Sequence, residues 1–442
     1  MLVLFLACTA DSTDTKSEVD PDAPTWYADV APIVQESCSG CHQPGGAAFD
    51  LTNPETAAAM AQAMASAVQE QRMPPWGAFE TDTCAPTRPW VGDRRLADVD
   101  IATLAAWAEG GAPVGDPAAD LTPASPEALT GNTVDLLPPA AYTTRAAADE
   151  LICLVIDPGL TEDLWVDGIE VIPENRGIAH HTLVMLDPSA ASDALVNEDG
   201  WYDCERSLGL TDPALLATWV PGSGPTYAPE GTGMRIPAGS RIVMQMHYHP
   251  AGVAGEVDRP TLRVRELASA ARYELHNTLI GNAPNEAAGL LPGPNDDGVV
   301  EFRIPANVAG HTEEMYATFD YEFPNLPIPT VGAHMHLIGT SMEVWIERAT
   351  PDAGEPEQEC LLSASRYEYD WQQLYRYEGD LTDMPMVSGG DSLRIRCTYD
   401  NTLDHEGTRR ALEDAGLDAP VDVYLGEGTL DEMCIGMFGY VY

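Results

Sequence analysis

From about residue 134 onward, short β-prone apolar runs alternate with turns rich in Pro and Gly. One set of runs covers residues 151–156, 169–172, 181–186, 241–247 and 261–265, and a second covers 299–304, 314–321, 334–346, 392–399 and 433–442. Short strands separated by turn residues are typical of antiparallel sandwiches. Because a turn-rich patch separates the two sets, we predict two tandem all-β, jelly-roll-like sandwiches, at 134–285 and 286–442.

Helical patterns precede these strands. Residues 26–34 read as a short helix, residues 56–70 are rich in Ala and Met, and residues 98–109 repeat apolar side chains on one helical face. We therefore predict a small all-α domain at 23–112. The segment 113–133 is rich in Gly, Pro, Ala and Asp without periodicity, so we expect it to be a linker.

A haem-attachment pattern lies within the helical segment. Cys38-Ser-Gly-Cys41-His42 matches C-x-x-C-H, in which two thiols form thioethers to the haem vinyl groups and the histidine reaches the iron. A zinc or redox site is the alternative, but we find no second C-x-x-C and no thioredoxin-like context. We predict one covalently bound haem c, attached through Cys38 and Cys41 with His42 as an axial ligand, in a cytochrome c-like domain.

The second axial ligand of this haem is expected to be a methionine. Met73, in an Arg-Met-Pro-Pro-Trp stretch, follows a candidate helix, where small cytochromes c often supply that ligand. Ligation by His and Met raises the reduction potential and suits electron transfer. Met60 and Met64 are alternative ligands, and Met73 could instead fill the core.

Two adjacent histidines lie inside an apolar run, where imidazoles are costly unless something binds them. On a regular strand, His180 and His181 would point to opposite faces. Both can bind one ion only where the strand ends, bulges or meets an edge. For this pair alone, two half-buried structural histidines would be the better interpretation.

Three later motifs supply further candidate ligands. Gln-Met-His247-Tyr-His249 closes an apolar strand, and His334-Met-His336 places two imidazoles on one face of a strand. An Asp-Glu-Met433-Cys stretch near the C-terminus offers a thioether. Imidazole together with thioether favours copper over zinc. Copper is therefore the expected metal.

In this order, the motifs resemble those of the copper type II, ascorbate-dependent monooxygenases, the family of peptidylglycine α-hydroxylating monooxygenase and dopamine β-monooxygenase. The resemblance covers roughly the last two-thirds of the chain. It implies an electron-transferring copper held by His180, His181 and His247, and an oxygen-activating copper held by the catalytic residues His334, His336 and Met433. It also implies a disulfide between Cys397 and Cys434.

Other histidines receive a different interpretation. His249 lies two residues beyond His247 and could replace it or join it as a ligand, although the Gln and Tyr of the motif favour His247. His276, His311 and His405 lie in polar, turn-like surroundings. We expect these three to be exposed on the surface.

The resemblance implies a copper-dependent monooxygenase that hydroxylates a C–H bond of a small organic substrate with O2. The external reductant would be ascorbate or a cytochrome-type donor. From the fusion of the haem segment to the copper sandwiches alone, we expect the haem to relay electrons from a redox donor protein. Gly332, two residues before His334, and Ile435 to Met437, after the Met motif, lack the polar anchors expected for a glycine-extended peptide. The alternatives are a non-enzymatic haem-copper electron carrier or copper-binding lipoprotein, and a structural sandwich that binds no stoichiometric copper.

Charge and cysteine content limit which partners and which cellular compartment are plausible. The formal net charge is -48, with 70 acidic residues against 22 basic ones, which argues against nucleic acid or an anionic membrane surface as partner. No stretch of 18 apolar residues occurs, so we expect no transmembrane helix. With Cys8 lipidated and two cysteines on haem, six of the nine cysteines remain for three disulfides in an oxidising compartment.

The N-terminal segment 1–22 is expected to be a signal and tether. Its first eight residues resemble the end of a bacterial lipoprotein signal, in which Cys8 would be lipidated, but the basic n-region is missing and the apolar run is short. We therefore expect a periplasmic or cell-surface protein with a lipid anchor. The oligomeric state is not predicted.

Overall fold

The computed structural model describes residues 23–46, 48–117, 128–147, 149–204, 207–250, 252–351, 354–428 and 430–442. The chain forms two compact units that take their residues from alternating stretches. One unit comprises Met1–Ser39, Asp50–Pro74 and Leu96–Ala124, and the other comprises Gly40–Phe49, Pro75–Arg95 and Ser125–Tyr442. The predicted tether and Cys8 lie outside the described residues.

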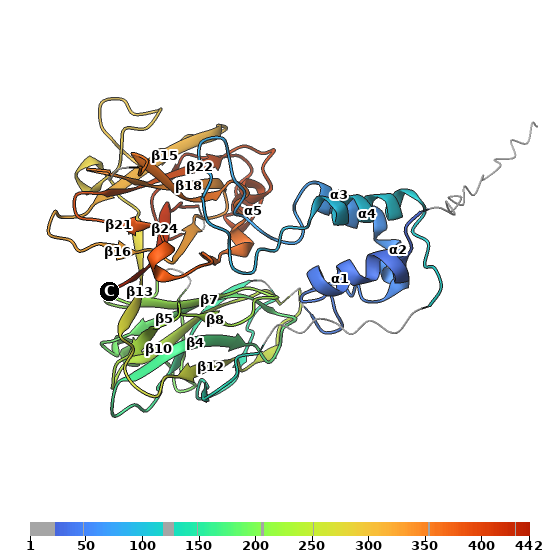
Figure 1. Ribbon diagram of the computed structural model, residues 1–442, viewed down its shortest axis with the longest axis horizontal. Helices are drawn as coiled ribbons and strands as arrows, with labels where there is room; N and C mark the ends of the chain where they lie inside the picture. The colour runs from blue at the N-terminus through green and yellow to red at the C-terminus, as the bar shows by residue number, and fades with distance from the viewer. Residues whose placement is uncertain are drawn as a thin grey trace, which may run out of the picture. The chain divides into compact units, whose positions relative to one another are not determined.

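The first unit is built from short helices (Figure 1). They are the π-helical turn Trp26–Val30, α1 (Ala31–Ser37), α2 (Pro54–Ala59), α3 (Ala61–Gln69) and α4 (Asp98–Glu109). The start of α2 follows its sequence, because the side chain of Asn53 accepts hydrogen bonds from the backbone of Glu55 and Thr56, and Pro54 needs no donor in the first turn. Trp26 and Trp107 are fully buried, with ring centroids 5.8 Å apart.

The predicted fold class is wrong in its N-terminal part. The described chain is mostly β-sheet with a few short helices, and it shows no all-α cytochrome c-like domain at 23–112. Two stretches inside that range, Gly40–Phe49 and Pro75–Arg95, belong to the β-rich unit. The predicted domain therefore does not exist as one folded body.

The physical reason for this correction is aromatic and covalent packing over a long sequence distance. Trp90 stacks on Tyr377 at 4.6 Å between ring centroids, and Cys84 forms a disulfide with Cys360, 276 residues away. Local helical periodicity carries no information about partners so far along the chain. From the segment 75–95, Trp76, Ala78 and Trp90 belong to the core of the β-rich unit.

Three sheets form most of the β-rich unit (Figure 1). The first has the order β6 (Trp201–Asp203), β3 (Glu150–Ile156), β10 (Arg241–Tyr248), β5 (Ala179–Asp187) and β7 (Ala214–Trp219). The second has the order β1 (Thr133–Leu136), β12 (Thr261–Glu266), β4 (Leu164–Ile172), β9 (Thr232–Ile236), β13 (Tyr273–Gly281), β24 (Ile435–Val441), β17 (Thr330–His334) and β20 (Leu374–Arg376), with β8 (Thr226–Tyr227) paired to β4. The third has the order β15 (Ala309–Thr318), β22 (Ser392–Asp400), β18 (Gly339–Glu347) and β19 (Gln358–Ala364).

Smaller elements complete the unit. Three two-stranded pairs join β2 (Tyr142–Thr143) to β11 (Val257–Asp258), β14 (Arg303–Ile304) to β23 (Val423–Tyr424), and β16 (Leu326–Pro327) to β21 (Met386–Val387). The helix α5 spans Glu406–Asp414, and short 3-10 turns lie at η2 (Ala191–Ala194), η3 (Glu286–Ala288), η4 (Tyr369–Trp371) and η5 (Leu381–Asp383).

The second sheet is shared by two hydrophobic cores. One core packs the five-stranded sheet against β4 and β12, and the other packs the four-stranded sheet against β17 and β24. Strand β22 illustrates the pattern, because its alternate residues Leu393, Ile395, Cys397 and Tyr399 are buried. Since β13 pairs with β24, the two sandwiches form one compact unit rather than independent tandem domains.

Three disulfides occur among the described residues, as cysteine arithmetic predicted. They join Cys84 to Cys360, Cys153 to Cys204, and Cys397 to Cys434, the last being the pair that the resemblance implied. Three disulfides are compatible with a periplasmic or extracellular protein. Within the part of the chain that the structure describes, no helix is long and apolar enough to cross a membrane.

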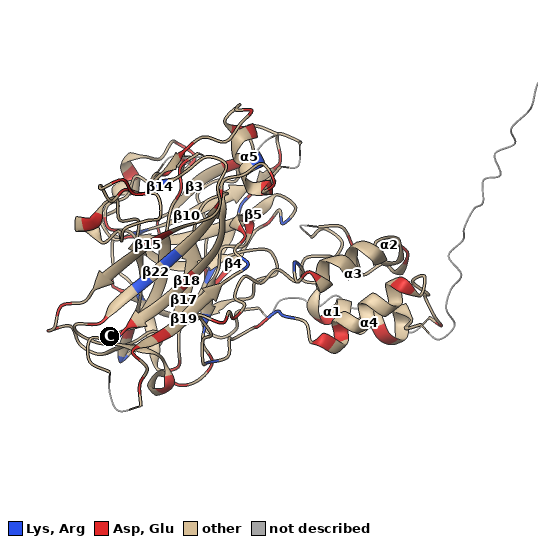
Figure 2. Cartoon of the chain, turned by 90° about the horizontal axis from the view of Figure 1, so that it is seen from above, with Lys and Arg blue, Asp and Glu red and all other residues tan. Residues whose placement is uncertain are grey.

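Acidic residues recur on the loops and helices of both units, and basic residues are sparse (Figure 2). Two of the basic positions lie on β22 beside β15 (Figure 2). Here Arg394 and Arg396 both donate to the carboxylate of Glu314. Pairing of this kind offsets part of the repulsion within a strongly acidic chain.

Candidate metal centre

The first candidate site lies where β5 and β10 meet. His181 pairs with His247 in the antiparallel register, but the next pair is Ala179 with Tyr248, so the register shifts by one residue. His180 is the extra residue of this bulge. The bulge meets the geometric condition for adjacent histidines to turn toward one ion.

Three imidazole nitrogens converge at the bulge. The Nδ1 atom of His181 lies 3.3 Å from that of His180 and 3.4 Å from that of His247. Two nitrogens bound to one metal at about 2.0–2.1 Å, with tetrahedral to trigonal angles, lie about 3.3–3.6 Å apart. One ring nitrogen cannot serve both neighbours as donor and acceptor. The described residues therefore include a group, His180, His181 and His247, that could hold a metal ion.

Burial keeps these imidazoles in the form that binds metals. Desolvation, with the nearby charge of His247, lowers the pKa of His180 to about 4. Desolvation likewise lowers the pKa of His181 well below its ordinary value. Metal ligation requires neutral imidazole. At neutral pH both rings offer a free lone pair.

Asp149 orients the third histidine. Its Oδ2 atom lies 3.1 Å from Nε2 of His247, and its Oδ1 atom lies 2.5 Å from Nδ1 of His249. If Nε2 of His247 donates to Asp149, the Nδ1 lone pair is left facing the cluster. Although burial raises the pKa of Asp149, its hydrogen bonds to His247 and His249 hold that pKa well below its usual range. His249 contacts Asp149 and stands outside the three-histidine group.

The second candidate site lies just past the end of β17. The His334 and His336 rings have centroids 5.5 Å apart. Nδ1 of His334 lies 2.6 Å from Oε1 of Gln372, and Nδ1 of His336 lies 2.9 Å from the carbonyl oxygen of Asp431. Both acceptors require a proton on Nδ1, so Nε2 carries the free lone pair. Burial, with the charge of His336, lowers the pKa of His334 to about 4.

Glu432 ties the methionine motif to the same loop. Its carboxylate is 1% exposed and accepts backbone hydrogen bonds from His336 at 2.7 Å, Ile338 at 2.9 Å and Met433 at 3.1 Å. The backbone carbonyl of Met433 accepts a further bond from the hydroxyl of Tyr399. These bonds hold the methionine motif beside the His-x-His loop.

One aromatic side chain contacts both histidine groups. The ring centroid of Tyr369, in η4, lies 6.2 Å from that of His181 and 6.4 Å from that of His336. The ring centroids of His181 and His336 are therefore no farther apart than the sum of these two distances. Asp370, the next residue, lies 3.9 Å from Nε2 of His180 and pairs with Arg410 of α5 at 2.9 Å. Burial raises the pKa of Tyr369 to about 12.

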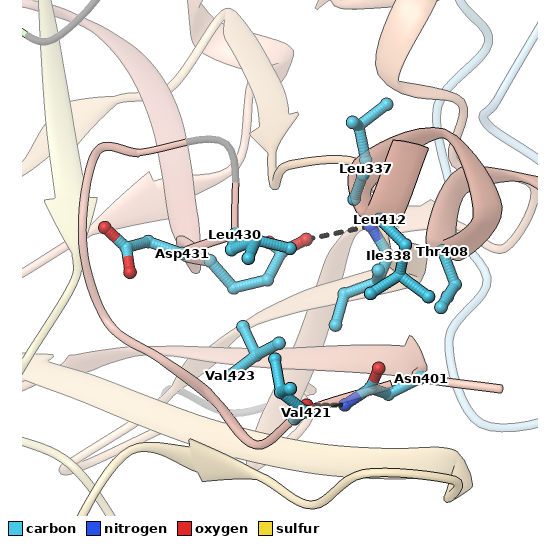
Figure 3. A pocket seen from close by; sticks show the side chains of 11 residues that line it. Leu337, Ile338, Asn401, Thr408, Leu412, Val421, Val423, Leu430 and Asp431 are labelled. Atoms are coloured by element: carbon cyan, nitrogen blue, oxygen red, sulfur yellow. Dashed lines mark hydrogen bonds between the residues drawn. The ribbon is translucent and has the colours of Figure 1, made fainter. Parts of the chain in front are cut away.

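A small cavity lies beside the methionine motif (Figure 3). Leu337, Ile338, Leu412 and Val423 line its apolar side, and Asp431 lies at its edge. Its volume of about 10 Å³ is barely enough for one water molecule. It is too small to accept an organic substrate.

The predicted haem residues are distributed over both units. Cys38 caps α1 in the helical unit, whereas Cys41 and His42 belong to the β-rich unit. Nδ1 of His42 lies 3.0 Å from the carbonyl oxygen of Phe49, and donation to it leaves Nε2 free. Met73, in the helical unit, is 37% exposed.

The alternative methionine ligands lie in the helical core. Met64 is 8% exposed and belongs to that core, and Met60 packs against it. A buried methionine is already used as an apolar filler. The exposed Met73 is therefore a freer thioether than Met64.

Sequence reasoning missed Asp149, Gln372, Glu432 and Tyr369. Asp149 had a detectable signal, because a carboxylate just before an apolar strand at the site edge is a frequent partner of ligating histidine. Gln372 and Tyr369 come from a loop more than thirty residues beyond the His-x-His motif. No local sequence pattern predicted a role for either residue.

Comparisons with known proteins give no family. No protein-family model and no curated protein matches the chain. Among solved structures, the chain is similar to the major capsid protein P2 from bacteriophage PM2 at 10% identity and a TM-score of 0.27, over 70% of this chain and 97% of that one. It is also similar to the infectious bursal disease virus VP2 subviral particle, at 11% identity and 0.18 over 72% and 73%. A peptide-N(4)-(N-acetyl-β-D-glucosaminyl) asparagine amidase matches at 10% identity and 0.20, over 66% and 99%. These scores carry no functional argument.

Proposed function

We propose that this chain is a copper-dependent monooxygenase that hydroxylates a C–H bond of a small organic substrate with O2 and an external reductant. The observation that carries the proposal is the convergence of three histidine Nδ1 atoms at the β5 bulge, at 3.3 Å and 3.4 Å. The order of the remaining motifs supports it, because His334, His336 and Met433 resemble the second copper site of the copper type II monooxygenases.

The residues present fit copper. Three imidazoles alone suit zinc as well as copper. A thioether in the second set favours copper, since soft ligands stabilise its reduced state. Bound copper would supply one-electron chemistry and O2 activation. His180, His181 and His247 would hold the electron-storing ion, and His334, His336 and Met433 the oxygen-activating ion.

The side chains around the ligands keep the imidazoles in defined tautomers. Asp149 accepts the Nε2 proton of His247, so this ring presents Nδ1. Gln372 accepts the Nδ1 proton of His334, so that ring presents Nε2. Fixed tautomers orient the lone pairs before a metal arrives. The two sites therefore use opposite ring nitrogens.

The C-x-x-C-H motif supports a second part of the proposal. Cys38 and Cys41 would attach one haem c, with His42 and Met73 as axial ligands, although not in a cytochrome c-like domain. A haem held by these residues would supply one-electron transfer with a redox donor protein. The proposal also includes a periplasmic or cell-surface location, with a lipid anchor at Cys8. At this location the protein would have access to the periplasmic electron carriers that could reduce its haem.

One observation favours a second candidate function, a non-enzymatic haem-copper electron carrier. The cavity beside the methionine motif is too small for an organic substrate, and the Tyr369 ring centroid lies 6.2 Å from that of His181 and 6.4 Å from that of His336. A carrier would use the same ligands without a substrate site. The two functions differ in whether O2 consumption is coupled to a hydroxylated product.

The test is reductant-dependent O2 uptake by the full chain across a panel of small aromatic and aliphatic compounds. The proposal predicts uptake matched by a hydroxylated product for at least one compound. Met433→Ala should abolish the uptake while His180, His181 and His247 keep their copper. Uptake without product, at the same rate in Met433→Ala, would support the carrier instead.

A further inference from the structure

Glu313 occupies an inward position on β15, where it pairs with Cys397 of β22. His311, Glu313 and Met315 alternate toward the core and are 4%, 0% and 1% exposed. The expectation that His311 lies on the surface is therefore wrong, because strand alternation carries it inside. A buried carboxylate is costly unless both of its oxygens are satisfied.

Only one oxygen of Glu313 is satisfied by protein. Oε1 lies 2.8 Å from Nε2 of His311 and accepts from the backbone N–H of Arg303 at 3.3 Å. Oε2 is buried without a hydrogen-bond partner among the described residues. The Oδ1 atom of Asn295 is likewise buried and unpartnered in the described chain, while its Nδ2 donates to the carbonyl of Arg303 at 2.9 Å.

The two unpartnered oxygens flank the same point. A Cβ placed on Gly293 would lie 3.2 Å from Oε2 of Glu313 and 3.7 Å from Oδ1 of Asn295. Gly293 does not adopt a left-handed conformation. Glycine serves here to leave room beside the carboxylate. The Gly293 N–H donates at 2.7 Å to Asp296, which brings a second carboxylate into the same loop.

Charge around the loop is compatible with a cation. The guanidinium of Arg303 donates to the backbone carbonyl of Asn295 at 3.1 Å and is already paired with Glu301 at 2.9 Å and Asp422 at 3.3 Å. Its charge is therefore largely offset. Oxygen-only ligand sets of carboxylates and amide carbonyls are those that Ca²⁺ prefers, and its flexible geometry tolerates a partial protein shell.

We propose that Ca²⁺ binds at this point, held by Oε2 of Glu313 and Oδ1 of Asn295, with the Asp296 carboxylate and water completing the shell. The ion joins the loop that follows β13 and η3 to the inner face of β15. Ca²⁺ does not compete for the histidine groups, because imidazole and thioether are poor ligands for it. The Ca²⁺ site therefore uses none of the proposed copper ligands.

The test uses the full chain, stripped with chelator and titrated with Ca²⁺ in about 0.15 M KCl, which screens weak binding to the acidic surface. Thermal unfolding and calorimetric titration are read together, with Mg²⁺ as the comparison ion. One Ca²⁺ per chain should bind with a Kd of about 10⁻⁴–10⁻³ M, the range of extracellular modules. The melting temperature should rise with Ca²⁺ more than with Mg²⁺.

Two variants and one control distinguish binding at this site from Ca²⁺ binding elsewhere on the acidic surface. Glu313→Gln can donate its amide to Asn295, so it should fold and lose the response to Ca²⁺. Gly293→Ala places a methyl group in the ion's position and should also lose it. Glu314→Gln removes a carboxylate from the opposite face of the same strand and should keep the full response.

Two results would overturn the proposal. If Glu313→Gln retains the Ca²⁺ response, the ion binds elsewhere on the acidic chain. If the unmutated chain shows no response, while its stability falls as pH rises through the range where Glu313 ionises, a proton shared with Asn295 satisfies both oxygens instead. Burial raises the pKa of Glu313, which makes this the rival state.

Discussion

Replacement of Asp149 by alanine should change the metal affinity of the first site without changing that of the second. Asp149 accepts from Nε2 of His247 at 3.1 Å and contacts neither His334 nor His336 through any hydrogen bond of the described chain. Without this acceptor, the His247 ring is free to flip or to carry its proton on Nδ1, where the metal should bind. Loss of such a carboxylate costs about 10–100-fold in metal affinity, or about 1.4–2.7 kcal/mol.

The assay is competition for Cu(I) between the reduced apo chain and a chromophoric chelator. Asp149→Ala should weaken one of two sites by about 10–100-fold and leave the other unchanged. Asp157→Ala is the matched control, because Asp157 follows the opposite end of β3. Equal weakening of both sites, or none at all, would refute the assignment of Asp149 to the first site.

Three further predictions follow from the same structure. Gln372→Leu removes the acceptor for Nδ1 of His334 and should weaken only the second copper site, by about 10–100-fold in the same chelator competition. The folded-state pKa values of His180 and His334, about 4, lie below the unfolded value of about 6.5, so the unfolded chain binds more protons between these limits. The metal-free chain should therefore lose stability as pH falls from about 6.5 to 4, as measured by urea unfolding, and a flat profile would contradict burial of neutral rings. Loss of the Cys84–Cys360 disulfide by double serine substitution should lower the free energy of unfolding by about 2–5 kcal/mol in the same measurement, against an unchanged value if segment 75–95 packs independently.

The sequence predicted the histidine groups because their signals are local. Adjacent imidazoles in a strand, and imidazoles two residues apart, are visible without knowledge of the fold. The bulge that aligns His180 with His181 was recognisable only as a requirement, since register depends on which strand pairs with β5. The residues that orient the ligands, Asp149 and Gln372, come from other strands and loops. Asp149 could be suspected from its place just before an apolar strand, but no spacing rule could find Gln372.

The N-terminal fold was misjudged for a related reason. Apolar periodicity correctly suggested helices near 56–70 and 98–109, and α3 and α4 lie there. Periodicity cannot show that the intervening segment 75–95 packs with β-strands nearly three hundred residues later. A long-range disulfide and tryptophan stacking outweigh the local pattern there.

Local sequence patterns also could not predict that the two sandwiches share the second sheet. The strands β13 and β24 lie at the end of the first predicted sandwich and at the end of the chain, yet they pair residue by residue from Leu275 with Val441 to Gly281 with Ile435. Turn-rich residues between the two sets of strands suggested a boundary. Sheet order, which depends on tertiary packing, placed both sets in one unit.

Copper content of the purified full chain tests the central claim most directly. After reconstitution with copper and removal of weakly bound ions, elemental analysis should give two coppers per chain, falling to one in His181→Ala and to one in His334→Ala. Retention of one ion in each variant would show two separate sites. No stoichiometric copper in the unmutated chain, or no loss in either variant, would contradict the account.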